Sequence, residues 1–363
     1  MNNTNPLTKK TAVICLSPNR GGMELASLKL TKILSEYINT IVIIQKDKFL
    51  HKQCIENEDY SKLTYETIKF KSTFSLSIML NTRKIIKKYN IKNVIFVGAS
   101  ELKSLYFAFI GLNINLIIRH GTTKSTPKKD WFHKLIYSNV KYHVAISKHL
   151  SNNVQKIVPF GKHTQLITIY PSMPKEISTE EKKDNKILKL LHVGRITKGK
   201  GLKEALIASE ILYKNHIEFS LDSYGEIATN YENEFTSFIN NLNYKNSFHL
   251  CGFTNNIYDE YQKHDIFIFP TKGEGFGNVV MEAISHGIII LSFDNTSISN
   301  FKELGFHIHL ADDTSIESLQ KKLFHIVSNL KEEKKLALEN ISKAKSFFSK
   351  EREAFEYIQL LKE

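Results

Sequence analysis

Hydrophobic residues in the first half of the chain form short, unbroken runs that are separated by longer amphipathic stretches. The runs at 11–17, 40–45 and 93–98 are rich in valine and isoleucine, whereas residues 23–37 and 76–89 repeat hydrophobic positions at helical spacing. Apolar strands that alternate with helices of about a dozen residues are typical of a parallel sheet covered on both faces. The pattern therefore predicts a doubly wound α/β domain.

The same alternation starts again in the second half, where it runs from 187 to 293. Residues 169–186 lie between the halves, are largely polar and contain two prolines, as expected of a linker. We therefore predict an N-terminal Rossmann-like domain over 1–175 and a C-terminal Rossmann-like domain over 176–345. The amphipathic stretch within 346–363 either extends the second domain or crosses back onto the first. Because open α/β sheets bind ligands at the carboxyl ends of their strands, we expect the two domains to share a cleft there.

The composition is consistent with two fully folded domains outside the membrane. The 363 residues exceed the usual size of one hydrophobic core, and 42% of them are hydrophobic. The longest apolar runs, at 266–270 and 287–293, fall far short of the ~20 residues that span a bilayer. The N-terminal segment is polar and carries no evident secretion signal. We expect a cytoplasmic protein that is soluble or peripheral to the membrane.

Three scattered cysteines fit the same compartment. Cys15, Cys54 and Cys251 form no CxxC pair. This spacing favours neither a disulfide framework nor a cysteine zinc site, and it is consistent with a reducing environment.

Positive charge is concentrated in the first half of the chain. Residues 1–175 hold 27 Lys and Arg against 9 Asp and Glu, a net charge of +18, whereas the remainder holds 23 against 28, a net charge of −5. This asymmetry suggests an anionic partner for the first half, such as a phospholipid surface, a phosphorylated acceptor or a nucleic acid. The alternative is that the lysines are solvated charges on helix surfaces.

A glycine-rich turn in the second half carries the most specific chemical signal. A strand ends at Pro270, a turn with several glycines follows, and a helix is predicted to begin near Gly277. Glycines let a ligand approach the backbone, and the amides of a helix's first turn suit a diphosphate. Glu274 precedes this helix and Glu282 lies within it, so their carboxylates can accept hydroxyls from different parts of one extended ligand. Alternatively, both are surface charges of the helix.

Two cations follow the first strand of the second half. Arg195 comes directly after the strand and Lys200 precedes a helix, so both can converge on charge at the end of the strand, such as a leaving diphosphate. The alternative is a pair of solvated loop cations. Residues 194–200 also read G-x-x-x-x-G-K, but Gly201 replaces the Ser or Thr that ligates magnesium in a P-loop, which disfavours an NTPase.

Together these motifs resemble the signature of retaining family 4 glycosyltransferases, which are group 1 glycosyl transferases of the GT-B fold. The resemblance rests on E-x7-E after "FPT", on A-x-x-x-G at 283–287, and on "VGR" followed by "KG". It implies that Glu274 contacts the donor sugar, that Glu282 holds the ribose, and that Arg195 and Lys200 hold the phosphates. The implied donor-binding residues are Gly21, Gly22, Arg195, Lys200, Glu274, Gly275, Phe276, Gly277, Asn278, Val279 and Glu282. The implied catalytic residues are Arg195, Lys200, Glu274 and His120.

The first-half members of that set follow predicted strands. Gly21 and Gly22 lie in the first strand-to-helix loop, which lacks G-x-G-x-x-G, and Gln45 stands where a dinucleotide-binding domain has an acidic residue. Dinucleotide binding is therefore disfavoured, and the resemblance places this loop between donor phosphate and acceptor. The resemblance also brings His120 near the donor sugar, although a lone histidine is often structural. Ser147 is predicted to cap a helix.

Cations and aromatic residues are interleaved just beyond His120. Lys128, Lys129, Trp131, Phe132 and Lys134 occur within one short segment. Such a helix could rest on an anionic membrane surface. The alternative is an ordinary amphipathic helix that buries Trp131 and Phe132.

The predicted reaction is transfer of a hexose from a nucleoside diphosphate sugar, UDP rather than GDP, with retention of configuration. The resemblance points to a glycan or lipid-linked acceptor in lipopolysaccharide or surface polysaccharide biosynthesis, and no nucleic acid partner is expected. The chain contains no D-x-D motif, so we expect neither a metal nor a cofactor beyond the donor. Stabilisation of the departing phosphate would drive the reaction, without a protein nucleophile.

One alternative is another GT-B enzyme, such as a nucleotide-sugar epimerase. A phosphorylase is disfavoured because no pyridoxal site is recognisable. A further alternative is that the protein is not an enzyme but a lipid- or nucleic-acid-binding module.

Overall fold

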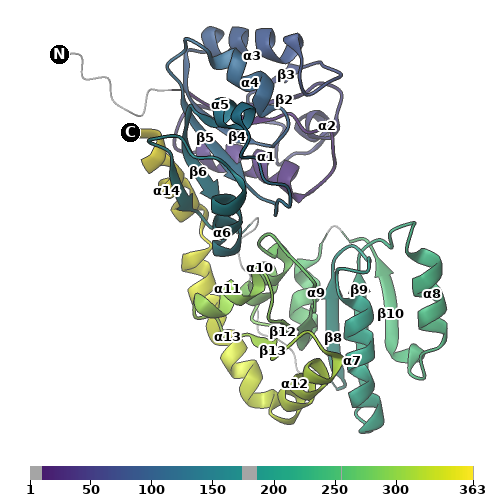
Figure 1. The fold of residues 1–363 in the computed structure, drawn as a ribbon. Helices are drawn as coiled ribbons and strands as arrows, with labels where there is room; N and C mark the ends of the chain where they lie inside the picture. Colours follow the sequence, from purple (N-terminus) through teal and green to yellow (C-terminus); the bar gives the residue numbers. More distant parts are fainter. Residues whose placement is uncertain (1–9, 174–185, 255, 363) are drawn as a thin grey trace. The chain divides into compact units, whose positions relative to one another are not determined.

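The structure, a computed structural model, describes residues 10–173, 186–254 and 256–362. The chain divides into two compact units (Figure 1). Unit 1 comprises Met1–Pro174 and Lys350–Glu363, and unit 2 comprises Lys175–Ser349. The predicted boundary at 175 and 176, most of the predicted linker and the N-terminal segment before Lys10 lie outside the described residues.

Unit 1 is built on a parallel sheet with the strand order β3-β2-β1-β4-β5-β6-β7. Its strands are β1 Lys10–Cys15, β2 Thr40–Gln45, β3 Tyr65–Ile68, β4 Ile91–Val97, β5 Asn115–His120, β6 Val140–Ala145 and β7 Gln165–Thr168. Its helices are α1 Gly22–Ser35, α2 Phe49–Glu56, α3 Leu76–Lys88, α4 Leu102–Phe109, α5 Trp131–Tyr137, α6 Lys148–Ile157 and α14 Lys350–Lys362.

Each face of the unit 1 sheet has its own hydrophobic core. Alternate residues of β1 point to opposite faces. Ala12 and Ile14 pack in the core that includes α3 and α4, whereas Val13 and Cys15 pack in the core that includes α1 and α14. Near-continuous apolar strands are needed because both faces are covered. The predicted doubly wound fold is confirmed for this unit.

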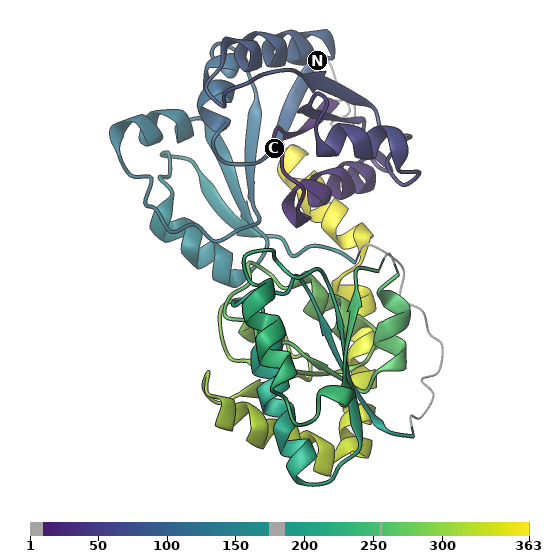
Figure 2. The same ribbon diagram turned by 90° about the vertical axis from the view of Figure 1, so that its right-hand side faces the viewer.

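Unit 2 has a second parallel sheet, with the order β10-β9-β8-β11-β12-β13 and helices on both faces (Figure 2). Its strands are β8 Leu188–Val193, β9 Phe219–Tyr224, β10 Phe248–Gly252, β11 Ile266–Ile268, β12 Ile289–Phe293 and β13 His309–Ala311. Its helices are α7 Leu202–Lys214, α8 Glu232–Asn240, the 3-10 helix Lys245–Ser247, α9 Tyr258–Lys263, α10 Asn278–Ser285, α11 Ile298–Glu303, α12 Ile316–Ser328 and α13 Leu330–Phe347.

The C-terminal amphipathic stretch is divided between the two units. The long helix α13 ends at Phe347, and α14 begins at Lys350 and packs beside α1 (Figure 2). Tyr357 of α14 is fully buried in the same core as α1. Buried Glu353 accepts hydrogen bonds from the Ser172 amide at 2.8 Å and from the Ser172 hydroxyl at 2.6 Å. The last helix is therefore an integral part of unit 1.

The strand order reverses between β8 and β11 in unit 2. In open α/β sheets, ligands bind at the carboxyl ends of the strands at such a reversal. The loops after these two strands contain the "VGR…KG" motif and the glycine-rich turn. Strand order thus brings together two motifs that are about 80 residues apart in sequence. Within the part of the chain that the structure describes, no helix combines the length and hydrophobicity needed to cross a bilayer.

Candidate functional site

The loops after β8 and β11 are packed directly against each other in unit 2. The Lys272 amide donates to the Gly199 carbonyl at 2.9 Å, and the buried Thr271 hydroxyl donates to the same oxygen at 3.2 Å. Gly201 adopts φ +82°, and a Cβ at this position would overlap the carbonyl group of Pro270. A glycine is required here for both reasons, because the left-handed backbone and the close contact each disfavour a side chain.

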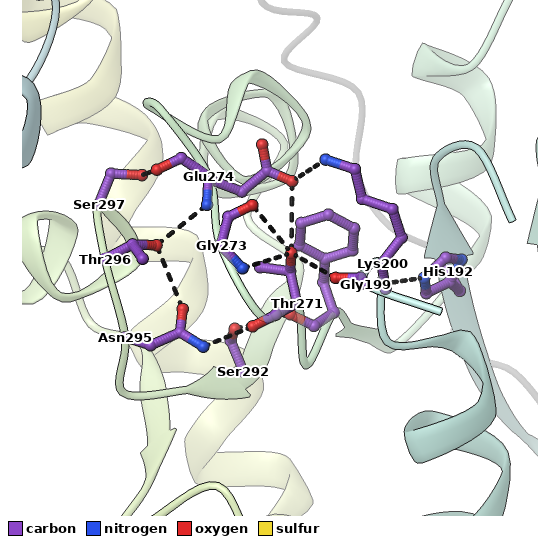
Figure 3. A network of polar contacts seen from close by, with 11 residues as sticks. His192, Gly199, Lys200, Thr271, Gly273, Glu274, Ser292, Asn295, Thr296 and Ser297 are labelled. Atoms are coloured by element: carbon purple, nitrogen blue, oxygen red, sulfur yellow. Dashed lines mark hydrogen bonds and ion pairs between the residues drawn. The ribbon is translucent and has the colours of Figure 1, made fainter. Parts of the chain in front are cut away.

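This packing brings Lys200 and Glu274 into contact (Figure 3). The Lys200 ammonium donates to a Glu274 carboxylate oxygen, and the two side chains are 34% and 15% exposed. The buried His192 imidazole supports the loop by donating from Nε2 to the Lys200 carbonyl at 2.9 Å. Burial lowers the pKa of His192 to about 4, so this support is neutral at physiological pH. A cation and a carboxylate are thus held together beyond the carboxyl ends of β8 and β11.

The loop after β12 holds the turn that carries Glu274 (Figure 3). The Glu274 amide donates to the Thr296 hydroxyl at 3.0 Å, and the Ser297 hydroxyl donates to the Glu274 carbonyl at 3.1 Å. The Asn295 amide donates to the Thr271 carbonyl at 2.6 Å. Sequence reasoning missed these three residues. Their signal was a polar cluster directly after a buried strand.

The glycine-rich turn leads into α10 as predicted. Gly277 is the N-cap, with φ +91°, and the helix begins at Asn278. Phe276 is buried and packs against Phe301, with ring centroids 5.1 Å apart. This anchor fixes the turn, while the first amides of α10, at Asn278 and Val279, lack acceptors within the helix and suit an anion.

Glu282 lies in the second turn of α10 and is half-buried. Its carboxylate accepts a hydrogen bond from the Tyr261 hydroxyl at 3.3 Å, and Tyr261 also donates to the Val279 carbonyl at 3.2 Å. Burial raises the pKa of this fully buried tyrosine well above its usual range, so the hydroxyl stays a donor. Tyr261 is a fourth residue that sequence reasoning missed. Gly275 lies in the turn between Glu274 and Phe276, and Arg195 is exposed two residues beyond β8.

Comparison with known proteins assigns a family to this arrangement. Residues 174–343, which include both loops and α10, match the family of glycosyl transferases group 1. The chain is 25% identical over 321 residues to the capsular polysaccharide biosynthesis glycosyltransferase CapH of Staphylococcus aureus, across 84% of this chain and 87% of CapH. Unit 2 thus matches the group 1 glycosyl transferase family, and the protein is a glycosyltransferase.

Further similarities are consistent with that assignment. The glycosyltransferase is 23% identical over 312 residues to N-acetylgalactosamine-N,N'-diacetylbacillosaminyl-diphospho-undecaprenol 4-alpha-N-acetylgalactosaminyltransferase of Campylobacter jejuni, across 80% of this chain and 82% of the relative. Its fold matches Anabaena HepE, solved in complex with UDP and glucose, with a TM-score of 0.75 at 14% identity, across 97% of this chain and 98% of HepE. The GT-B fold predicted from the sequence is confirmed, and the non-enzymatic alternative is excluded.

The remaining predicted site residues of the glycosyltransferase lie in unit 1. Gly21 is the N-cap of α1, and a Cβ there would lie 2.8 Å from the Glu24 carboxylate. Glu24 is buried and accepts a hydrogen bond from the Ser17 hydroxyl at 2.5 Å. Gly22 opens α1 and faces open space. Ser147 caps α6 as predicted, with its hydroxyl accepting from the Leu150 amide at 3.1 Å.

His120 ends β5 and has both ring nitrogens engaged within unit 1. Nε2 lies 2.9 Å from Nδ1 of His143, and Nδ1 lies 2.9 Å from the Lys124 ammonium. Burial, aided by the Lys124 charge, lowers the pKa of His120 well below its usual range, and burial lowers that of His143 to about 3. Both rings are therefore neutral. Because Lys124 donates to Nδ1, the His120 proton lies on Nε2 and is donated to His143. Lys124, four residues after His120, was missed from the sequence.

Lys124 gives a testable pH dependence. Burial lowers its pKa to about 8, whereas an unfolded lysine titrates near ~10.4. Between these values the unfolded chain binds more protons, so Lys124 makes the free energy of unfolding rise with pH. Urea denaturation from pH 7 to pH 10 should therefore show wild type gaining stability relative to Lys124→Met above pH 8. Lys124→Arg, which stays charged over this range, is expected to follow the slope of the Met variant. Parallel profiles for wild type and Lys124→Met would contradict the assigned environment.

Proposed function

We propose that the glycosyltransferase moves a hexose from a UDP-sugar to a hydroxyl of a glycan or lipid-linked acceptor, with retention at the anomeric carbon. The observation that carries this proposal is the contact between Lys200 and Glu274 beside the start of α10. It combines a cation suited to a phosphate and a carboxylate suited to sugar hydroxyls. We place the enzyme in surface polysaccharide or glycolipid biosynthesis, in keeping with the names of CapH and the Campylobacter relative.

In this proposal the donor separates the Lys200–Glu274 ion pair. The diphosphate accepts from Lys200, from Arg195 and from the first amides of α10, while sugar hydroxyls donate to Glu274. Glu282, oriented by Tyr261, accepts from the ribose. The ion pair is largely buried, so opening it costs free energy, which new hydrogen bonds to the donor offset. When the donor binds, Lys200 exchanges Glu274 for a phosphate oxygen, and Glu274 exchanges Lys200 for sugar hydroxyls.

Catalysis would rest on stabilising negative charge as the bond between the anomeric carbon and the phosphate oxygen breaks. Lys200, Arg195 and the α10 dipole act on charge that is greatest in the transition state. The departing phosphate takes the proton of the acceptor hydroxyl, and the acceptor oxygen bonds to the anomeric carbon on the same face. No metal ion and no protein nucleophile is needed for this sequence of bond changes.

Nucleotide binding and product analysis test the proposal. Calorimetric titration with UDP and GDP is expected to show binding of UDP, and a panel of UDP-sugars identifies the hexose by donor consumption. Binding of neither nucleotide would overturn the site. Conversion of a UDP-sugar to its epimer without acceptor would indicate the alternative GT-B enzyme. An NMR coupling constant that shows inversion would refute retention. Loss of turnover in EDTA that also occurs in His309→Ala, and that added Mg²⁺ or Mn²⁺ restores, would refute a metal-free reaction.

One surface of unit 1 has features that favour contact with an anionic membrane. Five exposed apolar side chains lie on or directly beside α3 and α4. We name them the α3–α4 strip: Phe74, Leu76, Leu80, Phe107 and Ile110. The Phe74 and Phe107 rings lie 6.0 Å apart, and Lys103 lies over the Phe74 ring. Apolar residues bordered by lysines are typical of helices that lie on membrane surfaces.

The neighbouring helix α5 supports the same orientation. Trp131 is 76% exposed, so the alternative in which α5 buries this tryptophan is wrong, whereas Phe132 does pack against the core. An exposed tryptophan suits the membrane interface. We propose that the glycosyltransferase is a cytoplasmic protein that binds the inner face of the membrane through this side of unit 1, where lipid-linked acceptors reside.

Vesicle binding tests the α3–α4 strip. Replacing Leu76 and Leu80 together with glutamate is expected to lower the fraction that sediments with anionic vesicles at least ~tenfold, because each buried leucine contributes ~1.5–3 kcal/mol. Phe253→Glu is the matched control, since Phe253 is 61% exposed on acidic unit 2. Equal sedimentation of the double variant and the control would refute the proposed surface.

A further inference from the structure

Two histidines and a glutamate converge in unit 2, apart from the donor-binding loops. Nε2 of His307 and Nε2 of His309 each lie 2.7 Å from the same Glu333 carboxylate oxygen. Within the described residues, this is the one group of three or more His, Cys, Asp or Glu side chains with all ligand atoms within 4.8 Å of one another. Three side chains that could bind a transition metal therefore have their ligand atoms close together.

Local structure holds these side chains in place. His309 is the first residue of the edge strand β13 and His307 lies two residues before it, and both side chains contact Glu333. Glu333 lies in the first turn of α13, and Asn340 follows two turns later on the same helix face. The buried Asn340 amide accepts from the His307 backbone N–H at 2.8 Å and donates to the His307 carbonyl at 2.9 Å. Such outer contacts commonly orient metal ligands.

We propose that His307, His309 and Glu333 form a binding site for a divalent transition metal ion, with Zn²⁺ as the probe. Imidazole nitrogen and carboxylate oxygen are ligands that suit zinc. In the ion's absence each Nε2 donates a hydrogen bond to Glu333, so each Nε2 must give up its proton before it can bind the ion.

The geometry needs only a small adjustment to accept the ion. Tetrahedral bonds of ~2.0–2.1 Å place neighbouring ligand atoms ~3.3 Å apart, so the two 2.7 Å contacts must open by roughly half an ångström. His309 and Glu333 side chains are 11% and 9% exposed, whereas that of His307 is 35% exposed. Solvent can therefore reach the site on the His307 side, where water would complete the coordination.

The position of the site indicates a structural role. His309 pairs with Leu291 of β12 at the amino end of β13, whereas the donor-binding loops follow the carboxyl ends of β8 and β11. An ion here would link the edge strand to α13, which also packs against α10 and places Ile341 beside Gly287, just after that helix. The proposed ion would stabilise unit 2 without touching the donor, so this inference is independent of the proposed reaction.

Direct metal titration of the tag-free, full-length chain tests the site without any nucleotide. Calorimetry with ZnCl₂ is expected to show one ion per chain with a dissociation constant of ~10 µM or lower. His309→Ala and Glu333→Gln are each expected to weaken binding at least ~tenfold. His249→Ala is the matched control, because His249 contacts a carboxylate of Asp222 at 2.7 Å outside the proposed site. Equal affinity of wild type and His309→Ala, or loss of binding in His249→Ala, would overturn the assignment.

Two wild-type measurements guard against variants that fold poorly. Co²⁺ is expected to give the intense visible absorption of a low-coordinate site, and Zn²⁺ should displace it. The melting temperature is expected to rise with Zn²⁺ and to return to its metal-free value in EDTA, because a ligand that binds only the folded state stabilises it. A cobalt spectrum typical of the hexaaquo ion, with an unchanged melting temperature, would refute the site.

Discussion

Replacing Lys200 with alanine is expected to lower the turnover number of the glycosyltransferase by about 10²–10³, the usual cost of removing one donor that stabilises transition-state charge. The variant should also bind UDP about 10- to 100-fold more weakly, because a hydrogen bond to a charged group contributes ~1.5–3 kcal/mol. Glu274 would lose its cationic partner but keep the backbone contacts of its turn to Thr296 and Ser297. Initial rates with the identified UDP-sugar and calorimetry with UDP measure the two effects.

Lys198→Ala is the matched control for that result. Lys198 lies in the same loop, is 71% exposed and pairs with Glu234 at 2.7 Å, so its removal changes the net charge by the same amount. We expect this variant to keep wild-type turnover and UDP affinity. Similar losses in both variants would mean that loop charge as a whole, rather than the Lys200 contact, attracts the donor.

Replacing Gly201 with alanine is the substitution with the largest expected effect on stability. A left-handed backbone costs a residue with a Cβ ~1–2 kcal/mol, and here the Cβ also overlaps the Pro270 carbonyl. The loops after β8 and β11 would have to separate, which also breaks the contact of Lys200 with Glu274. We expect urea denaturation to show a loss of ~2–4 kcal/mol in the free energy of unfolding of unit 2, accompanied by loss of UDP binding.

Gly199→Ala tests whether any glycine-to-alanine substitution in this loop would be destabilising. Gly199 lies two residues earlier, and a Cβ there meets nothing within 4 Å. We expect its stability to stay within ~0.5 kcal/mol of wild type. If Gly201→Ala unfolded at the same urea concentration as Gly199→Ala, the packing of the two loops would not be as described.

The strands that build the two sheets could be predicted because buried parallel strands are unbroken apolar runs. The run at 40–45 is β2, residue for residue. The edge strands β3 and β7 were missing from the prediction, since each has four residues that are mostly half-buried and mix polar with apolar side chains. Their place in the sheet is set by pairing with β2 and β6, which a local pattern does not reveal.

The candidate site could be predicted residue by residue but not as a set of contacts. Local motifs singled out Lys200 and Glu274 separately, whereas their contact depends on β8 lying next to β11 across two intervening strands in sequence. The same limit applies to Tyr261 and Thr296, whose importance comes only from what they touch. His120 was predicted at the end of its strand, but its partner His143 comes from neighbouring β6.

The return of α14 to unit 1 has a consequence for the order in which the protein is made. Five residues of α14, among them Ala354 and Tyr357, complete a core whose other residues are translated before unit 2 begins. Unit 1 is therefore discontinuous in the gene, with unit 2 inserted between its sheet and its last helix. On the ribosome, unit 2 can become complete while unit 1 still lacks part of its core. A fragment ending at Pro174 would leave that core uncovered, so separate expression of unit 1 requires α14 to be joined to it.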